Sequence, residues 1–200
     1  MKFNKRRFAA TVLACLIFCG YAHASDSPDY KTIRSAAQKG DAQSQYNLGV
    51  MYDQGYGPVR KNQVEAVKWY RKAANQNYPE AQYNLGVMYE RGYGIKQSDS
   101  EAVKWYMRAA DNGVSEAQYN LGVMYYAGRG VKQSYSEALK WYTKAAEQGD
   151  AEAQYNLGVM YANGRGVKKN EDEALKWFRL SAQNGNNDAQ AELRNAGQSW

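Results

Sequence analysis

Four glutamates recur at a fixed interval and form the series of side chains most suited to general acid–base chemistry. They are Glu65, Glu101, Glu137 and Glu173, each 36 residues from the next. Each follows, by three residues, an asparagine or serine (Asn62, Ser98, Ser134 and Asn170), and this spacing is typical of the capping box that begins a helix. We therefore interpret the glutamates as helix caps. No other pair of carboxylates is singled out by spacing and no nucleophile has a base beside it, so we predict that the protein is not an enzyme.

The residues best suited to covalent or metal chemistry are confined to the amino terminus. Cys15, Cys19 and His23 are the only cysteines and the only histidine. Without them the chain has no thiolate, no Ser-His-Asp triad, no disulfide and no ordinary zinc site. We predict no cofactor and no metal, and we keep a hydrolase, such as one with a β-lactamase-like activity, as the third hypothesis.

Residues 1–24 have the layout of a cleavable signal peptide. A basic start precedes an apolar run over residues 8–19, and the small-residue pattern Ala22-His23-Ala24 follows. A transmembrane helix needs roughly 20 apolar residues, so we expect no stable membrane insertion. We place cleavage after Ala24 and expect a periplasmic or secreted protein. The basic residues of this segment are Lys2, Lys5, Arg6 and Arg7.

Two other kinds of export signal fit the leader less well. Cys15 and Cys19 each follow apolar residues, as lipidated cysteines do, but Phe18 is bulky where a small residue is expected before Cys19. The Arg6-Arg7 pair is also found in twin-arginine signals. We favour simple cleavage of an ordinary secretory signal over a lipoprotein, and this route needs no cofactor.

The charge of the chain depends on this leader. The formal net charge is +6, and removing the four basic residues of the leader lowers it to +2. Acids and bases are interspersed through the remainder, whereas nucleic-acid binding calls for a basic patch. We therefore expect no nucleic acid among the partners.

One unit is repeated four times. Tyr-Asn-Leu-Gly-Val-Met-Tyr begins at Tyr46, Tyr83, Tyr119 and Tyr155, at intervals of 37, 36 and 36 residues, and a tryptophan recurs at 69, 105, 141 and 177. We divide the chain into the leader, a linker and capping helix over 25–41, repeats over 42–78, 79–114, 115–150 and 151–186 (together about 42–185), and a capping segment over 187–200. A fixed period of this length predicts a repeat solenoid.

Each unit has the pattern of a helical hairpin. In repeat two, a first helix is predicted over 80–91, with Ala81, Leu85 and Met88 on one face. Gly86 interrupts this face at a cost of about 1 kcal/mol, which suggests close approach of the second helix. A Gly-x-Gly turn ends the first helix and Ser98 caps the second, whose buried stripe includes Trp105 and Tyr106. The repeat tryptophans are interpreted as core residues.

The repeated words Ala-x-x-x-Leu-Gly-x-Met-Tyr, Gly-x-Gly-Val, Ala-Leu-Lys-Trp-Tyr and Ala-Ala-x-x-Gly resemble Sel1-like repeats, which are related to tetratricopeptide repeats. The resemblance identifies an exported bacterial member and implies an all-α, right-handed superhelical solenoid of antiparallel helix pairs. It also implies an adaptor function, although a fold alone does not determine function. Some exported members are cysteine-rich and described as acting on β-lactams, but this chain lacks their cysteines after the leader.

A stack of hairpins has a concave surface lined by its first helices, where we expect a partner to bind. In the related tetratricopeptide repeats, an asparagine at the position of Asn84 often holds an extended peptide, and an amide has the donors and acceptor to do so. Residues at the last turn of the first helix vary between repeats, which is typical of a tailored surface. The predicted partner-binding residues are Tyr46, Asn47, Val50, Tyr83, Asn84, Val87, Glu90, Arg91, Tyr119, Asn120, Val123, Tyr126, Tyr155, Asn156, Val159 and Asn163.

Two interpretations of these residues stay open. The tyrosines and asparagines bind a partner, or they tie neighbouring repeats together. The leading functional hypothesis is a non-catalytic exported scaffold that engages an extended segment of another protein. The second is an envelope protein that binds peptidoglycan or another polysaccharide, because aromatic-rich surfaces stack sugars.

Overall fold

The computed structural model describes residues 30–200, so the predicted signal peptide lies outside the described part of the chain. All regular structure in residues 30–200 is helical. The first helices of the four repeats are α3 (Ala42–Gln54), α5 (Pro79–Arg91), α7 (Ser115–Ala127) and α9 (Ala151–Asn163). The second helices are α4 (Gln63–Ala74), α6 (Asp99–Asp111), α8 (Tyr135–Glu147) and α10 (Glu171–Gln183). A lone α2 (Tyr30–Gln38) precedes them and a lone α11 (Asn187–Asn195) follows.

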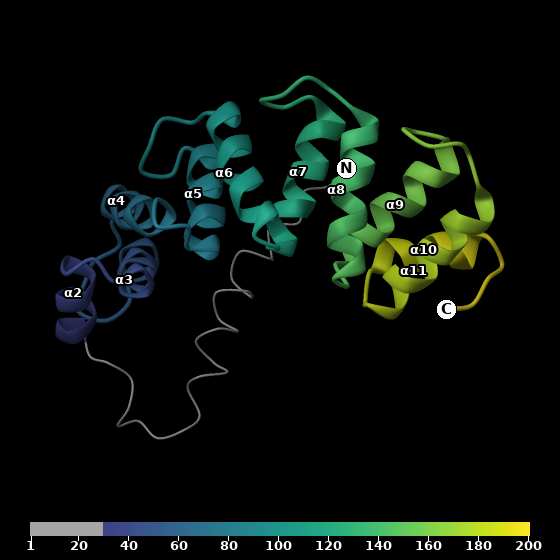
Figure 1. Ribbon diagram of the computed structural model, residues 1–200. Coiled ribbons are helices and arrows are strands. Elements are labelled where there is room, and N and C mark those ends of the chain that lie inside the picture. Colours follow the sequence, from purple (N-terminus) through teal and green to yellow (C-terminus); the bar gives the residue numbers. More distant parts are fainter. Residues whose placement is uncertain (1–29) are drawn as a thin grey trace.

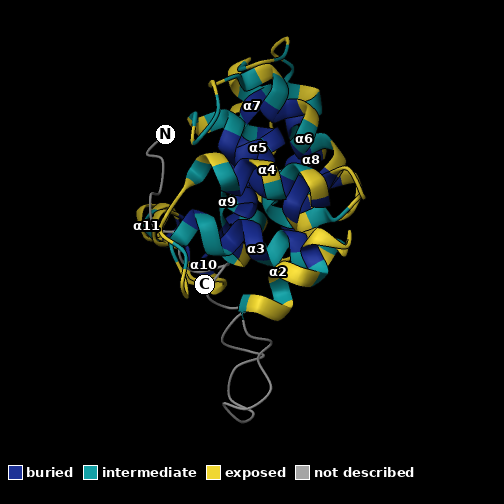
Figure 2. Cartoon of the chain, turned by 90° about the vertical axis from the view of Figure 1, so that its left-hand side faces the viewer, coloured by how far each residue is buried: buried dark blue, intermediate teal, exposed yellow. Residues whose placement is uncertain are grey.

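The helices form an arch in which each packs against the helix before it and the helix after it (Figure 1). The buried residues run through the middle of the arch, while exposed residues gather at the turns and outer surfaces (Figure 2). Each of four apolar clusters takes residues from more than one helix. This is the all-α solenoid of helix pairs that the repeats predicted.

The glycine inside each first helix allows the second helix to approach. A methyl group built on Gly86 would lie 2.6 Å from Cδ1 of Tyr106 in α6. Gly49, Gly122 and Gly158 meet Tyr70, Tyr142 and Phe178 in the same way. Interior Cβ atoms do not approach other atoms this closely, so the expected reason for the interior glycines is confirmed.

Both ends of the turn between the two helices are built as predicted, with one difference. Gly92 ends α5 in the left-handed conformation, with φ of +70°, and its N–H donates to the Met88 carbonyl. The Ser98 hydroxyl accepts from the Glu101 N–H at 3.3 Å. The second half of the capping box is not formed, because the Ser98 N–H donates to the Tyr89 carbonyl at 2.9 Å. The Glu101 carboxylate instead pairs with Lys104 at 2.6 Å.

The tryptophans, interpreted as core residues, are buried to different degrees. Trp141 is buried, Trp105 and Trp177 are partly buried and pack against core clusters, and Trp69 is partly buried. A basic side chain from the next turn lies over several of the rings, as Arg108 does over Trp105 at 4.6 Å from the ring centroid. The fully buried aromatic is the next residue along the helix, because it is the one that faces the glycine of the first helix. These core aromatics are Tyr70, Tyr106, Tyr142 and Phe178.

A series of glutamines, absent from the sequence predictions, joins each repeat to the one before it. The buried Gln118 of α7 donates to the Ala110 carbonyl at the end of α6 at 3.0 Å. Its own side-chain oxygen accepts from Gln148, just after α8, at 2.7 Å. The Ala110 carbonyl, at the end of its helix, also accepts from the Gly113 N–H at 3.0 Å, so the glutamine supplies a further hydrogen bond to it. The equivalent donors are Gln45, Gln82, Gln154 and Gln190.

Candidate interaction surface on the first helices

Two first helices, α7 and α9, contact each other directly. The apolar clusters also bring residues of successive first helices together, such as Val50 of α3 with Ala81 and Leu85 of α5. Twelve of the sixteen predicted binding residues are partly or fully exposed, and we call them the first-helix face. They are Tyr46, Asn47, Tyr83, Glu90, Arg91, Tyr119, Asn120, Val123, Tyr126, Tyr155, Val159 and Asn163.

The other four predicted residues are buried, and their assignment to the surface is corrected here. Val50 is 6% exposed and packs in a cluster with Ala81 and Leu85 of the next first helix. Val87 is 3% exposed and packs with α7 in the same way. The first helix of the following repeat therefore covers these valines. Asn84 and Asn156 are likewise buried.

The asparagines contact tyrosines of the preceding repeat. Burial raises the pKa of Tyr70 well above its ordinary value, and a hydrogen bond from Asn84, one repeat later, opposes this rise. Asn120 makes the same contact with Tyr106. For Asn84 and Asn120 the geometry thus favours the interpretation that they tie neighbouring repeats together.

Each repeated tyrosine of the face lies against a core aromatic. The ring of Tyr83 is tilted against the core ring of Tyr106, with centroids 5.8 Å apart. Tyr46, Tyr119 and Tyr155 lie against Tyr70, Tyr142 and Phe178 at 5.9, 5.9 and 5.6 Å. The core contact takes up part of each ring and reduces the ring surface available for stacking on a sugar.

Acidic side chains lie near two of these tyrosines. Burial and then the charges of Glu192, Asp188 and Glu152 raise the pKa of Tyr155. Burial and then Glu116 and Glu90 raise the pKa of Tyr83, and Arg91 opposes the rise. Acidic side chains therefore outnumber basic ones around both tyrosines.

The last turn of the first helix differs in each repeat. Asp53 is buried, and burial raises its pKa although Gln54 donates to its carboxylate at 2.9 Å. Its equivalents Glu90, Tyr126 and Ala162 are partly exposed. The residue that follows is exposed in repeats two to four, where it is Arg91, Ala127 and Asn163. The residues of the last turn that vary between repeats are therefore exposed mainly in repeats two to four.

An ion network joins repeats two and three at this turn. Glu90 accepts from the Tyr106 hydroxyl at 2.7 Å and from Arg129 at 3.1 Å. Arg129, in the Gly-x-Gly turn of repeat three, also pairs with Asp99 at 3.0 Å. Sequence reasoning missed Arg129, because it lies 39 residues from Glu90. The available signal was the middle residue of the turn, which changes from Tyr56 and Tyr93 to Arg129 and Arg165.

The same place between repeats three and four contains no acid. Tyr126 and Tyr135 stand at the positions of Glu90 and Asp99, with their rings edge to face at 5.1 Å between centroids. Arg165 takes the position of Arg129 and lies over the Tyr126 ring, 5.6 Å from its centroid. It also donates to the Tyr126 hydroxyl. The two junctions therefore differ in charge while sharing one backbone design.

Within 30–200, no group of three or more histidine, cysteine, aspartate or glutamate side chains is arranged to hold a metal ion. In that same part of the chain, no helix is both long enough and apolar enough to cross a bilayer.

Solved structures resemble the arch over most of its length. A protective antigen of uropathogenic Escherichia coli, c5321, is 36% identical with a TM-score of 0.81, over 86% of this chain and 37% of that one. A Sel1 repeat protein from Oxalobacter formigenes is 41% identical with a TM-score of 0.73, over 79% of this chain and 64% of that one. Cysteine-rich protein B of Helicobacter pylori is 26% identical with a TM-score of 0.54, over 66% of this chain and 96% of that one. This chain thus spans less than two thirds of the first two proteins.

Comparison with curated proteins gives no match. The Sel1 repeat, in contrast, matches residues 42–78, 79–114, 115–150 and 151–186. These four units make up most of the chain, and the chain therefore belongs to the Sel1 repeat family.

Proposed function

We propose that this chain is an exported, non-catalytic scaffold that binds another protein along the first-helix face. The observation that carries the proposal is the contrast between a constant framework and a variable last turn. The glycine contacts, caps and glutamine bonds repeat from unit to unit, whereas the residues at Glu90, Tyr126 and Ala162 do not. Sel1 repeats commonly serve as interaction scaffolds, which agrees with this division.

Export is supported by the leader sequence, with its basic start, apolar run and Ala22-His23-Ala24. Sequencing the amino terminus of the protein purified from its own cell tests this part, with Ser25 as the expected first residue. An intact leader would contradict it.

The binding surface is tested by site-specific photocrosslinking in the native cell. A photoreactive residue replaces Arg91 or Asn163, both exposed at the last turn of a first helix. The matched control replaces Lys104 or Lys140, which are exposed on second helices. The proposal expects a discrete crosslinked protein from the first pair and none from the control pair. Equal crosslinking from all four positions would contradict the surface.

Sedimentation with purified peptidoglycan separates this proposal from the envelope-glycan alternative. The core contacts of Tyr83 and Tyr119 disfavour sugar stacking, so we expect the protein to stay in the supernatant. Saturable sedimentation that is lost in Tyr119→Ala would favour the glycan instead.

A further inference from the structure

Tyr106 and Tyr142 occupy the same place in successive repeats, but their hydroxyl groups differ. The Tyr106 hydroxyl donates to the Glu90 carboxylate at 2.7 Å, and Arg129 donates to the other oxygen of that carboxylate at 3.1 Å. The Tyr142 side chain is fully buried, and its hydroxyl has no hydrogen-bond partner among residues 30–200. Buried polar groups in folded proteins nearly always have a partner, so this exception needs an explanation.

The difference arises because one acid is missing while its partners are kept. Tyr142 and Arg165 stand 36 residues after Tyr106 and Arg129, in equivalent positions. The residue equivalent to Glu90 is Tyr126. Tyr106 and Arg129 both donate to the Glu90 carboxylate at the junction of repeats two and three. The equivalent donors at the junction of repeats three and four, Tyr142 and Arg165, have no such carboxylate.

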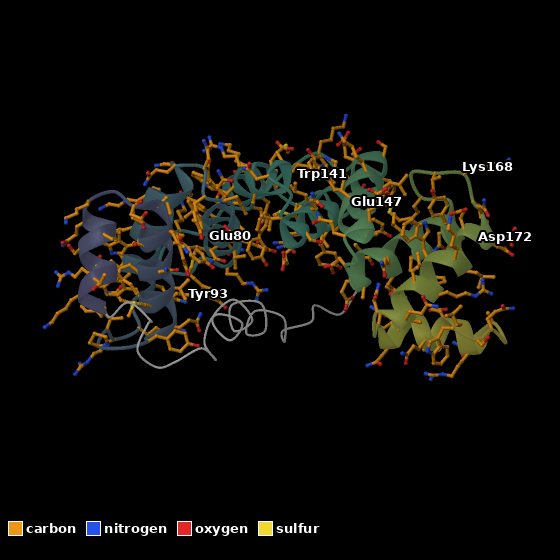
Figure 3. The ribbon with its side chains drawn as sticks, turned by 60° about the horizontal axis from the view of Figure 1, so that its bottom comes forward. Glu80, Tyr93, Trp141, Glu147, Lys168 and Asp172 are labelled. Carbon is orange, nitrogen blue, oxygen red and sulfur yellow. The ribbon has the colours of Figure 1, made fainter. Side chains whose placement is uncertain are left out.

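The charged residues near Arg165 in the sequence are of both signs. Arg165 is exposed, and Lys168 in the same turn projects to solvent (Figure 3). The first turn of α10 contains Glu171, Asp172 and Glu173, of which Glu171 pairs with Lys169 at 2.9 Å and Glu173 with Lys176 at 3.5 Å. Glu116 and Glu152 lie in the first turn of helices whose last turn is next to Arg165. A 13-residue helix is about 20 Å long, so these acids are well beyond a Debye length of about 8 Å from the site.

We infer that Arg165 and Tyr142 form a receptor for a carboxylate of a bound protein, at the junction of repeats three and four. The carboxylate takes the place that Glu90 has in the preceding junction, with one oxygen on the guanidinium and the other on the hydroxyl. Tyr126 is its movable cover, because its partly exposed ring must turn aside for the carboxylate to reach the enclosed hydroxyl. The inference rests on the proposed function and specifies the chemistry of the partner.

The carboxylate belongs to an aspartate or glutamate side chain or to a chain terminus, and small probes distinguish these sources. N-acetylglutamate N-methylamide carries the side-chain group, N-acetylalanine carries the terminal group, and N-acetylglutamine N-methylamide is the neutral control. Protein NMR records the ring signals of Tyr126 and Tyr142 during titration with each probe. We expect saturable shifts with at least one acid and none with the neutral probe.

Three variants test which residues bind the carboxylate. Charge-assisted hydrogen bonds are the strong ones, so Arg165→Gln is expected to weaken binding by about tenfold or more. Tyr126→Glu supplies an internal carboxylate and is expected to abolish binding. Tyr142→Phe weakens binding but leaves the free protein equally or more stable, whereas the matched Tyr106→Phe lowers stability by removing a bond that exists.

Equal shifts with the neutral probe, or full binding by Arg165→Gln, would overturn the receptor. So would a loss of stability in free Tyr142→Phe, because the hydroxyl would then already be satisfied. If the protein crosslinked through Arg91 or Asn163 is captured equally by Tyr126→Glu, the receptor is wrong and the scaffold stands. If no protein is crosslinked from either position, the scaffold is wrong, and the probe titration still tests the receptor by itself.

Discussion

Gly86 of α5 lies directly against the ring of Tyr106 in α6, so that a methyl group on Gly86 would stand 2.6 Å from Cδ1 of the ring. This contact sets the separation of the two helices in a repeat. It also explains why four first helices accept a residue that is unfavourable in a helix interior.

Gly86→Ala is therefore expected to destabilise the protein despite the better helix propensity of alanine. Overpacking a core costs about 1–3 kcal/mol, against a propensity gain of about 1 kcal/mol. Urea denaturation followed by circular dichroism measures the net loss. In a Tyr106→Ala background the clash is absent, so the same substitution should become neutral or stabilising. A destabilisation of equal size in both backgrounds would show that the ring is not the cause.

The glutamine contacts give a second prediction. Gln118→Ala removes two hydrogen bonds, each contributing about 0.5–1.5 kcal/mol net, and is expected to cost about 1–3 kcal/mol. Gln43→Ala, at an exposed position of α3, is the control and should be close to neutral. Equal stabilities of the two variants in thermal denaturation would contradict the role given to Gln118.

More of the fold than of the candidate site could be predicted from the sequence. The helices depend on residues that are close together in the sequence, whereas the site depends on residues that are far apart. Helix bounds, caps and the interior glycine follow from spacings of a few residues. The choice between Trp105 and Tyr106 as the buried aromatic depends on which one faces Gly86, and a hydrophobic stripe contains both. Val50 and Val87 are buried by the next repeat, so the apolar pattern of their own helix does not reveal that they are buried. The Arg129 network joins residues 30 and 39 positions apart, beyond any local pattern.

Asp53 gives the third prediction, on pH. Burial raises its pKa in the folded chain, so the folded state binds this proton more tightly than the unfolded state. Stability therefore falls as pH rises from the ordinary aspartate pKa, about 3.9, through the raised value, and the penalty is complete above it. Asp53→Asn is expected to be more stable than the parent at pH 7. Its advantage should shrink on acidification, measured by urea denaturation from pH 7 to pH 3. Asp172→Asn, at an exposed site, is the control, and lower stability of Asp53→Asn at pH 7 would refute this sign.

The fourth prediction supplies Asp53 with the partner that Glu90 has. Tyr93 stands in the turn of repeat two where Arg129 stands in repeat three. Tyr93→Arg is expected to pair with Asp53 and raise the free energy of unfolding at pH 7 by about 1 kcal/mol, as hydrogen bonds to charged groups do. Tyr56→Arg is the matched control, because α2, the helix that precedes repeat one, contains no acidic residue. A gain in both variants would point to general charge effects instead.

The central claim is that a protein partner binds the first-helix face, and one affinity comparison tests it most directly. Once crosslinking has identified the bound segment, isothermal titration calorimetry measures its affinity for the parent, for Arg91→Ala combined with Asn163→Ala, and for Lys104→Ala combined with Lys140→Ala. The scaffold proposal predicts that the first double variant binds at least about tenfold more weakly than the parent, since each interface residue that matters costs more than about 1 kcal/mol when truncated. It predicts parental affinity in the second double variant. Parental affinity in the first variant with a loss in the second would place the partner on the second helices and contradict the claim.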